Sequence, residues 1–151
     1  MTRRFVVAAA MCLALVAGAG ARAAGEHGTP EEAKAMVLKA AEYIKQNGQE
    51  KAFAAIMDPA GPFHDKDIYV FVHDASGVVK AHGGFPSYVG RNTVGVTDVD
   101  GKAFVKEITE VKTSGWVDYK WQNPQTKEVA EKTVYVMNVD GLLVCAGAYK
   151  D

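Results

Sequence analysis

"DIYVFVHDASGVVKAH" (residues 67–82) predicts two strands joined by a tight turn. From Asp67 to His73 successive side chains alternate between the two faces of a strand. Both faces carry apolar or amphipathic residues, so we expect both to be at least partly covered. Residues 74–77 (DASG) form a turn sequence with glycine where a positive φ is needed. Val78 to His82 is the predicted returning strand.

Three further strands are predicted over residues 115–122, 131–139 and 142–149. A loop at 123–127 joins the first two, and Asp140-Gly141 is a type I′ hairpin signal before the third. Strands joined by short hairpins form antiparallel sheets, so we expect one sheet of about five strands.

Alternation along these strands also separates their large side chains. Tyr119 and Trp121 fall on one face of the 115–122 strand, and Trp116 falls on the other. In the next strand, Lys132 shares a face with valines, and Tyr135 belongs to the opposite face.

Helical patterns lie outside these strands. Thr29-Pro30-Glu31-Glu32 is a capping box, and the apolar residues that follow recur every three or four positions. Asn47-Gly48 ends this long helix, and a shorter one follows at about 49–57. Asp100 is predicted to cap a third helix over 101–112.

Helices segregated from an antiparallel sheet define the α+β class. The long N-terminal helix can cover only one face of the sheet. The other face must be covered by the polar, glycine-rich loop at 83–100 and the third helix, or by a ligand between them.

Residues 1–23 predict a cleaved secretory signal peptide. Arg3-Arg4 precedes an uncharged stretch at 5–20, and Ala21-Arg22-Ala23 is a small-x-small cleavage site. The stretch is shorter than the ~20 residues that span a bilayer comfortably. We expect a soluble periplasmic or secreted protein with one domain over 28–151. Its mature chain is mildly acidic, which argues against a nucleic-acid partner.

Patterns for catalysis, metals and cofactors are weak or absent. Cys145 is the only cysteine of the mature chain and is predicted to be a small buried hydrophobe. His64, His73 and His82 are spaced nine residues apart, which matches no compact zinc motif. No nucleophile motif or phosphate loop is present. We therefore predict no enzyme, metal or cofactor. A metal or redox enzyme would need the three histidines to converge.

Several blocks of the chain, in their order and spacing, resemble a known family. They are "DIYVFVHDASGVVKAHGGFPSYVGRN" (67–92), "DVDGKAFVKEI" (98–108), "SGWVDYKWQNPQTKEVAEKTVYV" (114–136) and "GLLVCAGAYKD" (141–151). Together they resemble a single Cache domain, an extracytoplasmic sensor module of bacterial chemoreceptors and histidine kinases. The resemblance implies a PAS-like fold, with a long N-terminal helix packed on a five-stranded antiparallel sheet. It also implies a pocket on the opposite face for organic acids, amino acids or amines.

The expected ligand site combines charged and aromatic side chains. Arg91 offers a planar fork of donors that suits a carboxylate, although most arginines are simply at the surface. Lys132 either faces a pocket or snorkels to the end of its strand, and the resemblance favours the pocket. His82 is either a polar pocket residue or a histidine that bonds to the loop backbone. Tyr119 and Trp121 either line a pocket or pack in the core. The predicted ligand-binding residues are Tyr69, His82, Arg91, Tyr119, Trp121, Lys132 and Tyr135.

Two hypotheses of function follow. The first is an exported Cache-type protein that binds a small organic ligand, favouring a carboxylate, which ties the 83–100 loop onto the sheet. It would act alone or with a membrane-bound sensor. The second is a protein-interaction module without a ligand, which docks to a membrane sensor or forms a homodimer through the N-terminal helix. An exposed apolar patch would favour the second hypothesis.

Overall fold

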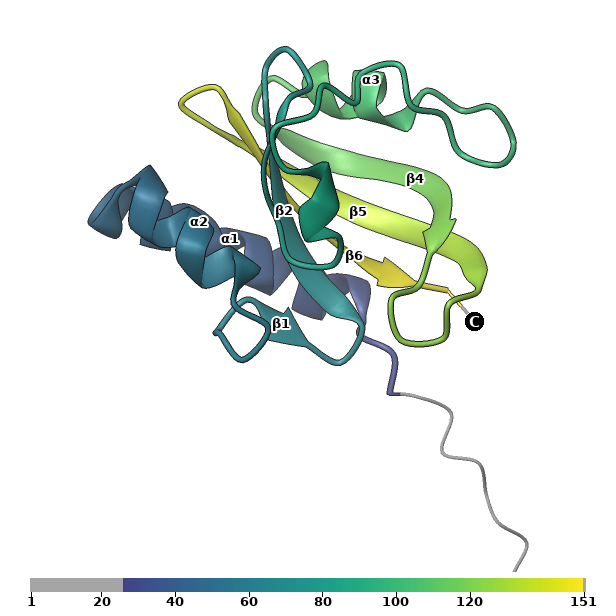
Figure 1. The fold of residues 1–151 in the computed structure, drawn as a ribbon, viewed down its shortest axis with the longest axis horizontal. Coiled ribbons are helices and arrows are strands. Elements are labelled where there is room, and N and C mark those ends of the chain that lie inside the picture. The colour runs from purple at the N-terminus through teal and green to yellow at the C-terminus, as the bar shows by residue number, and fades with distance from the viewer. Residues whose placement is uncertain (1–25, 151) are drawn as a thin grey trace, which may run out of the picture.

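The computed structural model describes residues 26–150, which form one antiparallel sheet with helices on both sides (Figure 1). The predicted signal peptide, residues 1–23, lies outside the described residues. Within residues 26–150, no helix is both long and apolar enough to cross a membrane. The helices are α1 (Pro30–Asn47), α2 (Gln49–Met57), the 3-10 turn η1 (Pro86–Tyr88) and α3 (Phe104–Thr109). The strands are β1 (His64–Asp65), β2 (Ile68–Asp74), β3 (Val79–His82), β4 (Ser114–Gln122), β5 (Val129–Val139) and β6 (Leu142–Tyr149).

The last strand of the chain lies at the centre of the sheet. β6 pairs with β2 on one side and with β5 on the other, and β3 and β4 extend the sheet beyond β2 and β5. All of these pairs are antiparallel. Every residue of β6 is buried, which its central position explains. The five longer strands confirm the predicted α+β fold, and the two-residue β1, which pairs with β2, was not predicted.

Helix α1 packs on one face of the sheet, as predicted. The hydroxyl of Thr29 accepts a hydrogen bond from the Glu32 amide, and the Glu32 carboxylate accepts one from the Thr29 amide. The buried stripe of α1 packs against alternate side chains of β2, β5 and β6, including Val70, Val72 and Val144. In Figure 1, α1 and α2 lie together on this side of the sheet, away from α3. A packed core therefore closes this face.

The opposite face carries a second apolar cluster. Phe104, Val105 and Ile108 of α3 pack here with side chains of the central strands. Cys145 belongs to this cluster and is fully buried with a free thiol, as predicted. Its burial raises the pKa of the thiol far above the usual range, which keeps the sulfur protonated and unreactive.

The predicted third helix, 101–112, is longer than the observed α3, and Asp100 does not cap it. The Asp98 carboxylate instead accepts hydrogen bonds from the amides of Asp100, Lys102 and Lys120. These bonds hold residues 98–102 in a turn against β4. The backbone therefore enters the helix only at Phe104.

Candidate functional site

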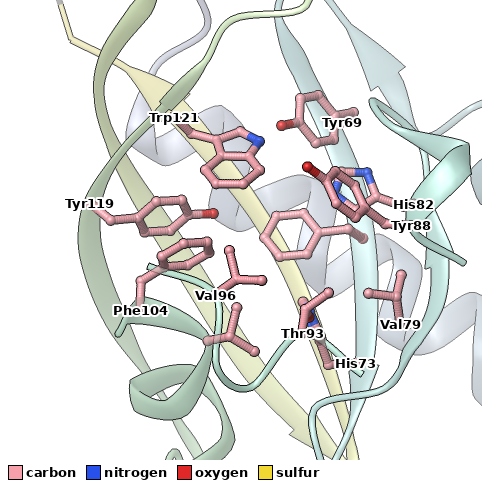
Figure 2. A pocket seen from close by; sticks show the side chains of 12 residues that line it. Tyr69, His73, Val79, His82, Tyr88, Thr93, Val96, Phe104, Tyr119 and Trp121 are labelled. Atoms are coloured by element: carbon pink, nitrogen blue, oxygen red, sulfur yellow. The ribbon is translucent and has the colours of Figure 1, made fainter. Parts of the chain in front are cut away.

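A small cavity lies on the second face of the sheet, beneath the 83–100 segment. Its volume is about 30 Å³, which is room for about two water molecules. Figure 2 shows side chains from separate segments converging on this space. The lining residues are Tyr69, Phe71, His73, Val79, His82, Tyr88, Thr93, Val96, Phe104, Val105, Tyr119 and Trp121.

Aromatic rings make up most of the cavity wall. Phe71 stacks on His82 with ring centroids 5.1 Å apart, and the Trp121 indole lies 6.2 Å from the Tyr88 ring. Phe85 joins this group, with its centroid 6.3 Å from Trp121. Tyrosine and tryptophan combine apolar area with a hydrogen-bonding tip, so such a wall suits a small amphipathic ligand.

Lys132 is a buried cation behind this wall, only 1% exposed. Its Nζ donates a hydrogen bond to Tyr69 Oη at 2.9 Å and lies 4.0 Å from the centroid of the same ring. The rings of Tyr149 and Phe71 are 4.8 Å and 5.4 Å away. Burial lowers the pKa of Lys132 to about 7, and the attraction of the Asp67 carboxylate opposes this shift only in part. No carboxylate within residues 26–150 forms an ion pair with Lys132.

The hydrogen bonds beyond Lys132 run in one direction. Tyr149 donates to the Gln122 carbonyl at 2.8 Å, so its 3.2 Å bond to Tyr69 must be donated by Tyr69. Tyr69 in turn accepts from Lys132. Only one of the three ammonium hydrogens therefore reaches an oxygen within residues 26–150. The Nζ atom is otherwise enclosed by the rings of Tyr69, Tyr149 and Phe71.

Gly147 on β6 provides the space through which the Lys132 side chain runs. A Cβ at this position would lie 2.6 Å from a Val134 methyl carbon, 2.7 Å from the Thr133 carbonyl oxygen and 2.8 Å from Lys132 Cε. All three distances are shorter than a Cβ atom tolerates. The buried position of the Lys132 side chain therefore depends on glycine at residue 147.

We expect Gly147→Ala to push Lys132 out of position and to lower the free energy of unfolding by about 1–3 kcal/mol. Urea denaturation measures this change. Gly115→Ala is the matched control, because an added Cβ there meets no atom within 4 Å. Equal stability of the two variants would contradict the role assigned to Gly147.

His82 and His64 occupy different environments. His82 Nδ1 accepts a hydrogen bond from the Phe85 amide at 2.9 Å, which leaves its Nε2–H as a donor. Burial, reinforced by Lys132, holds the pKa of His82 well below its usual range, so the ring is neutral. His64 bonds to the Ile56 carbonyl and lies outside the cavity. No cluster of three or more metal-ligating side chains occurs in the part of the chain that the structure describes.

Five of the seven predicted site residues gather at this place. Tyr69, His82, Tyr119 and Trp121 line the cavity, and Lys132 lies against the Tyr69 and Phe71 rings. Tyr119 is the direct cross-strand partner of Lys132, and it borders both the cavity and a polar groove that reaches Lys132.

Two predicted residues lie elsewhere. Arg91 is exposed and outside the cavity lining, and its backbone carbonyl accepts a bond from the Val79 amide. Tyr135 points to the α1 face, where its ring lies 5.0 Å from that of Trp116 and 5.2 Å from Lys34 Nζ. Tyr135 is separated from the site by the sheet itself, because residues an odd number of positions apart on a strand face opposite sides.

The cavity also contains residues that the sequence analysis did not select. Alternation along β2 places Phe71 and His73 on the face of Tyr69, and this signal was available. Tyr88 and Phe104 come from the 83–100 segment and the helix after it. Side chains of an irregular segment follow no periodic pattern, so the sequence does not predict which of them point into the cavity.

A long helix on one face of this sheet and a ring-lined cavity on the other define a PAS-like domain. The chain belongs to the Single Cache domain 2 family, whose sequence model matches residues 3–151. This match confirms the predicted resemblance. The domain is therefore of the type found as a sensor in chemoreceptors and histidine kinases.

Individual relatives agree with this assignment. The chain is 35% identical to the sensor histidine kinase MctS of Rhizobium johnstonii over 92 residues, which cover 58% of this chain and 20% of the kinase. The chain thus matches only about a fifth of that protein's length.

Solved structures share the fold. A methyl-accepting chemotaxis protein from Vibrio parahaemolyticus superposes with a TM-score of 0.70 at 22% identity, over 80% of this chain and 88% of the other. A Cache chemosensory domain described for carboxylic acid recognition gives a TM-score of 0.71 at 24% identity, over 80% and 92%.

Proposed function

We propose that this domain binds a small organic carboxylate and reports it as a sensor, without catalysing a reaction. The observation that carries this proposal is Lys132, a buried amine that has no carboxylate partner within residues 26–150. A buried cation without a paired anion is costly, and the Asp67 carboxylate attracts Lys132 only from beyond ion-pair distance. An anion that enters the site would form the direct pair that Asp67 does not. Carboxylic acid recognition by a Cache domain of the same fold supports the same ligand class.

The carboxylate would accept hydrogen bonds from the ammonium hydrogens that have no oxygen partner. The Nε2–H of His82 is a neutral donor in the same wall. The centroid of the His82 ring lies 5.3 Å from that of the Tyr69 ring. The rings of Phe71, Tyr88 and Trp121 would cover the apolar part of the ligand. Charge on one side and rings on the other suit a short chain with one carboxylate group.

Entry of such a ligand requires the ring wall to move. A cavity of about 30 Å³ is too small for several carbon atoms, but a hollow of about 290 Å³ adjoins it and shares Tyr88 and Trp121. Displacement of Tyr88 with the η1 turn would join the two spaces. A ligand that contacts both the sheet and η1 would then favour the closed position of this segment.

A panel of ligands on the full chain tests the proposal. We expect a carboxylate such as propionate or butyrate at 100 times its dissociation constant to add about 2.7 kcal/mol to the free energy of unfolding. The neutral amides and the amines of the same shape are matched controls, because neither gives Lys132 an anionic partner. Thermal shift and calorimetry measure the effect. The proposal fails if no carboxylate stabilises the protein, or if amides do so equally.

Export and signalling are part of the same proposal. A related structure is a periplasmic sensor domain, which supports a periplasmic site for this domain, with a signal peptide ending at Ala23. N-terminal sequencing of the exported protein tests the cleavage. The output module would be a membrane-bound sensor, in the same chain or in a partner, because the related kinase extends far beyond the matched region.

A further inference from the structure

His73 occupies the end of the cavity away from Lys132. It is the histidine of β2 and is 3% exposed. Figure 2 shows it beside Thr93 and Val79, at the opposite end of the site from Tyr69 and Trp121. The Phe71 ring lies between the two ends, 5.4 Å from Lys132 Nζ and 5.7 Å from the centroid of the His73 ring.

The hydrogen bonds of Thr93 fix the protonation of this imidazole. The Thr93 hydroxyl donates its one hydrogen to the Gly77 carbonyl, with the oxygens 3.2 Å apart. Its 3.1 Å contact with His73 Nε2 must therefore be donated by the histidine. Nε2 carries the hydrogen, and Nδ1 presents a lone pair. Burial lowers the pKa of His73 to about 4, so this neutral form is present at pH 7.

Nδ1 of His73 has no hydrogen-bond partner in the described chain. Among residues 26–150 it is the only buried side-chain nitrogen or oxygen that lacks a hydrogen-bond partner. Buried polar atoms are nearly always bonded, and leaving an acceptor unpaired is costly. Val79, Val96 and Val105 line the same cavity, and their side chains offer no donor. The missing partner of Nδ1 is therefore not supplied by residues 26–150.

We propose that His73 Nδ1 is the second polar anchor of the ligand site and selects carboxylates that carry a hydrogen-bond donor at their far end. This inference rests on the proposed function, because Lys132 holds the carboxylate. The chain of the ligand runs along the Phe71 ring and brings a hydroxyl or ammonium group to Nδ1. Ligands that end in a methyl group leave the acceptor unpaired and bind more weakly.

Calorimetry with matched ligand pairs tests this selection on the full chain. The pairs are propionate and 3-hydroxypropionate, butyrate and 4-hydroxybutyrate, and valerate and 5-hydroxyvalerate, with the corresponding ω-amino acids as the ammonium arm. We expect at least one donor-bearing ligand to bind about tenfold more tightly than its parent. In His73→Phe this ratio falls to about one. In the control His64→Phe, which alters a histidine outside the cavity, the ratio is unchanged.

Failure of this inference differs from failure of the proposed function. If no carboxylate binds the wild-type chain, the proposed function falls and this inference falls with it. If carboxylates bind but no pair shows a preference, or if His73→Phe keeps the preference, only the His73 assignment is overturned. A water molecule that donates a hydrogen bond to Nδ1 in place of the ligand would produce carboxylate binding without a preference within the pairs.

A measurement on the wild-type chain avoids any folding defect of the variant. Nitrogen-15 NMR of the His73 ring should show hydrogen on Nε2 and an unprotonated Nδ1. The Nδ1 resonance should shift on addition of the hydroxy ligand and not on addition of its parent. Hydrogen on Nδ1, or equal shifts with both ligands, would overturn the assignment.

Discussion

Replacing Lys132 by methionine is expected to abolish carboxylate binding and to raise the free energy of unfolding at neutral pH. The ligand loses Lys132, the only buried lysine or arginine among residues 26–150, which should weaken binding at least about 100-fold. The protein no longer has to bury an amine, and methionine fills a similar volume, so stability should rise by about 1–3 kcal/mol. The hydrogen-bond chain tolerates the change. Tyr69 still donates to Tyr149, and Tyr149 still donates to Gln122, so no donor is left unpaired.

Lys106→Met is the matched control for this experiment. Lys106 lies on α3, lines neither the cavity nor the adjoining hollow, and forms an exposed ion pair with Glu110 at 3.4 Å. Exposed pairs contribute little, so both affinity and stability should remain close to the wild type. Calorimetry and urea denaturation on the two variants measure both quantities. Retained affinity in Lys132→Met, or a large loss of stability, would show that Lys132 serves the core instead of a ligand.

The free energy of unfolding of the ligand-free protein is expected to increase as the pH is raised from 7 toward 10. Burial lowers the pKa of Lys132 from 10.5 to about 7. Across this window the unfolded chain holds a proton that the folded chain has lost, so stability rises with pH. The full effect amounts to several kcal/mol and is absent below about pH 7. Urea denaturation between pH 7 and 9.5 measures the slope, and Lys132→Met should remove it.

Ligand binding should show the opposite dependence on pH. A bound carboxylate restores the proton to Lys132, so binding above pH 7 takes up a proton and weakens by up to about tenfold per pH unit. Calorimetry in buffers of different ionisation enthalpy detects this uptake directly. A flat stability profile together with no proton uptake would contradict the protonation state assigned to Lys132.

Strand alternation was the most informative signal in the sequence. It separated Ile68, Val70 and Val72, which pack under α1, from Tyr69 and Phe71, which line the cavity. It worked because the strands are regular and both faces are covered by different elements.

The same signal argued against one selected residue. Lys132 and Tyr135 were predicted to lie on opposite faces of one strand, so both could not belong to one pocket. The structure places Tyr135 under α1 accordingly. The side chains of the 83–100 segment, such as Arg91 and Tyr88, could not be assigned because their directions depend on tertiary contacts. The start of α3 likewise depends on Asp98, whose carboxylate accepts a hydrogen bond from the distant Lys120 amide. A local sequence pattern cannot predict this contact.

The positions of the two tryptophans of β4 allow ligand binding to be followed by intrinsic fluorescence. Trp121 borders the cavity, whereas Trp116, on the other face of the strand, is 45% exposed. Trp116→Phe would leave a single indole emitter, in contact with the Tyr88 and Phe85 rings that ligand entry should displace. Its emission intensity and wavelength would then follow occupancy of the site in real time. Opening of the ring wall could be timed by stopped-flow without attaching a dye.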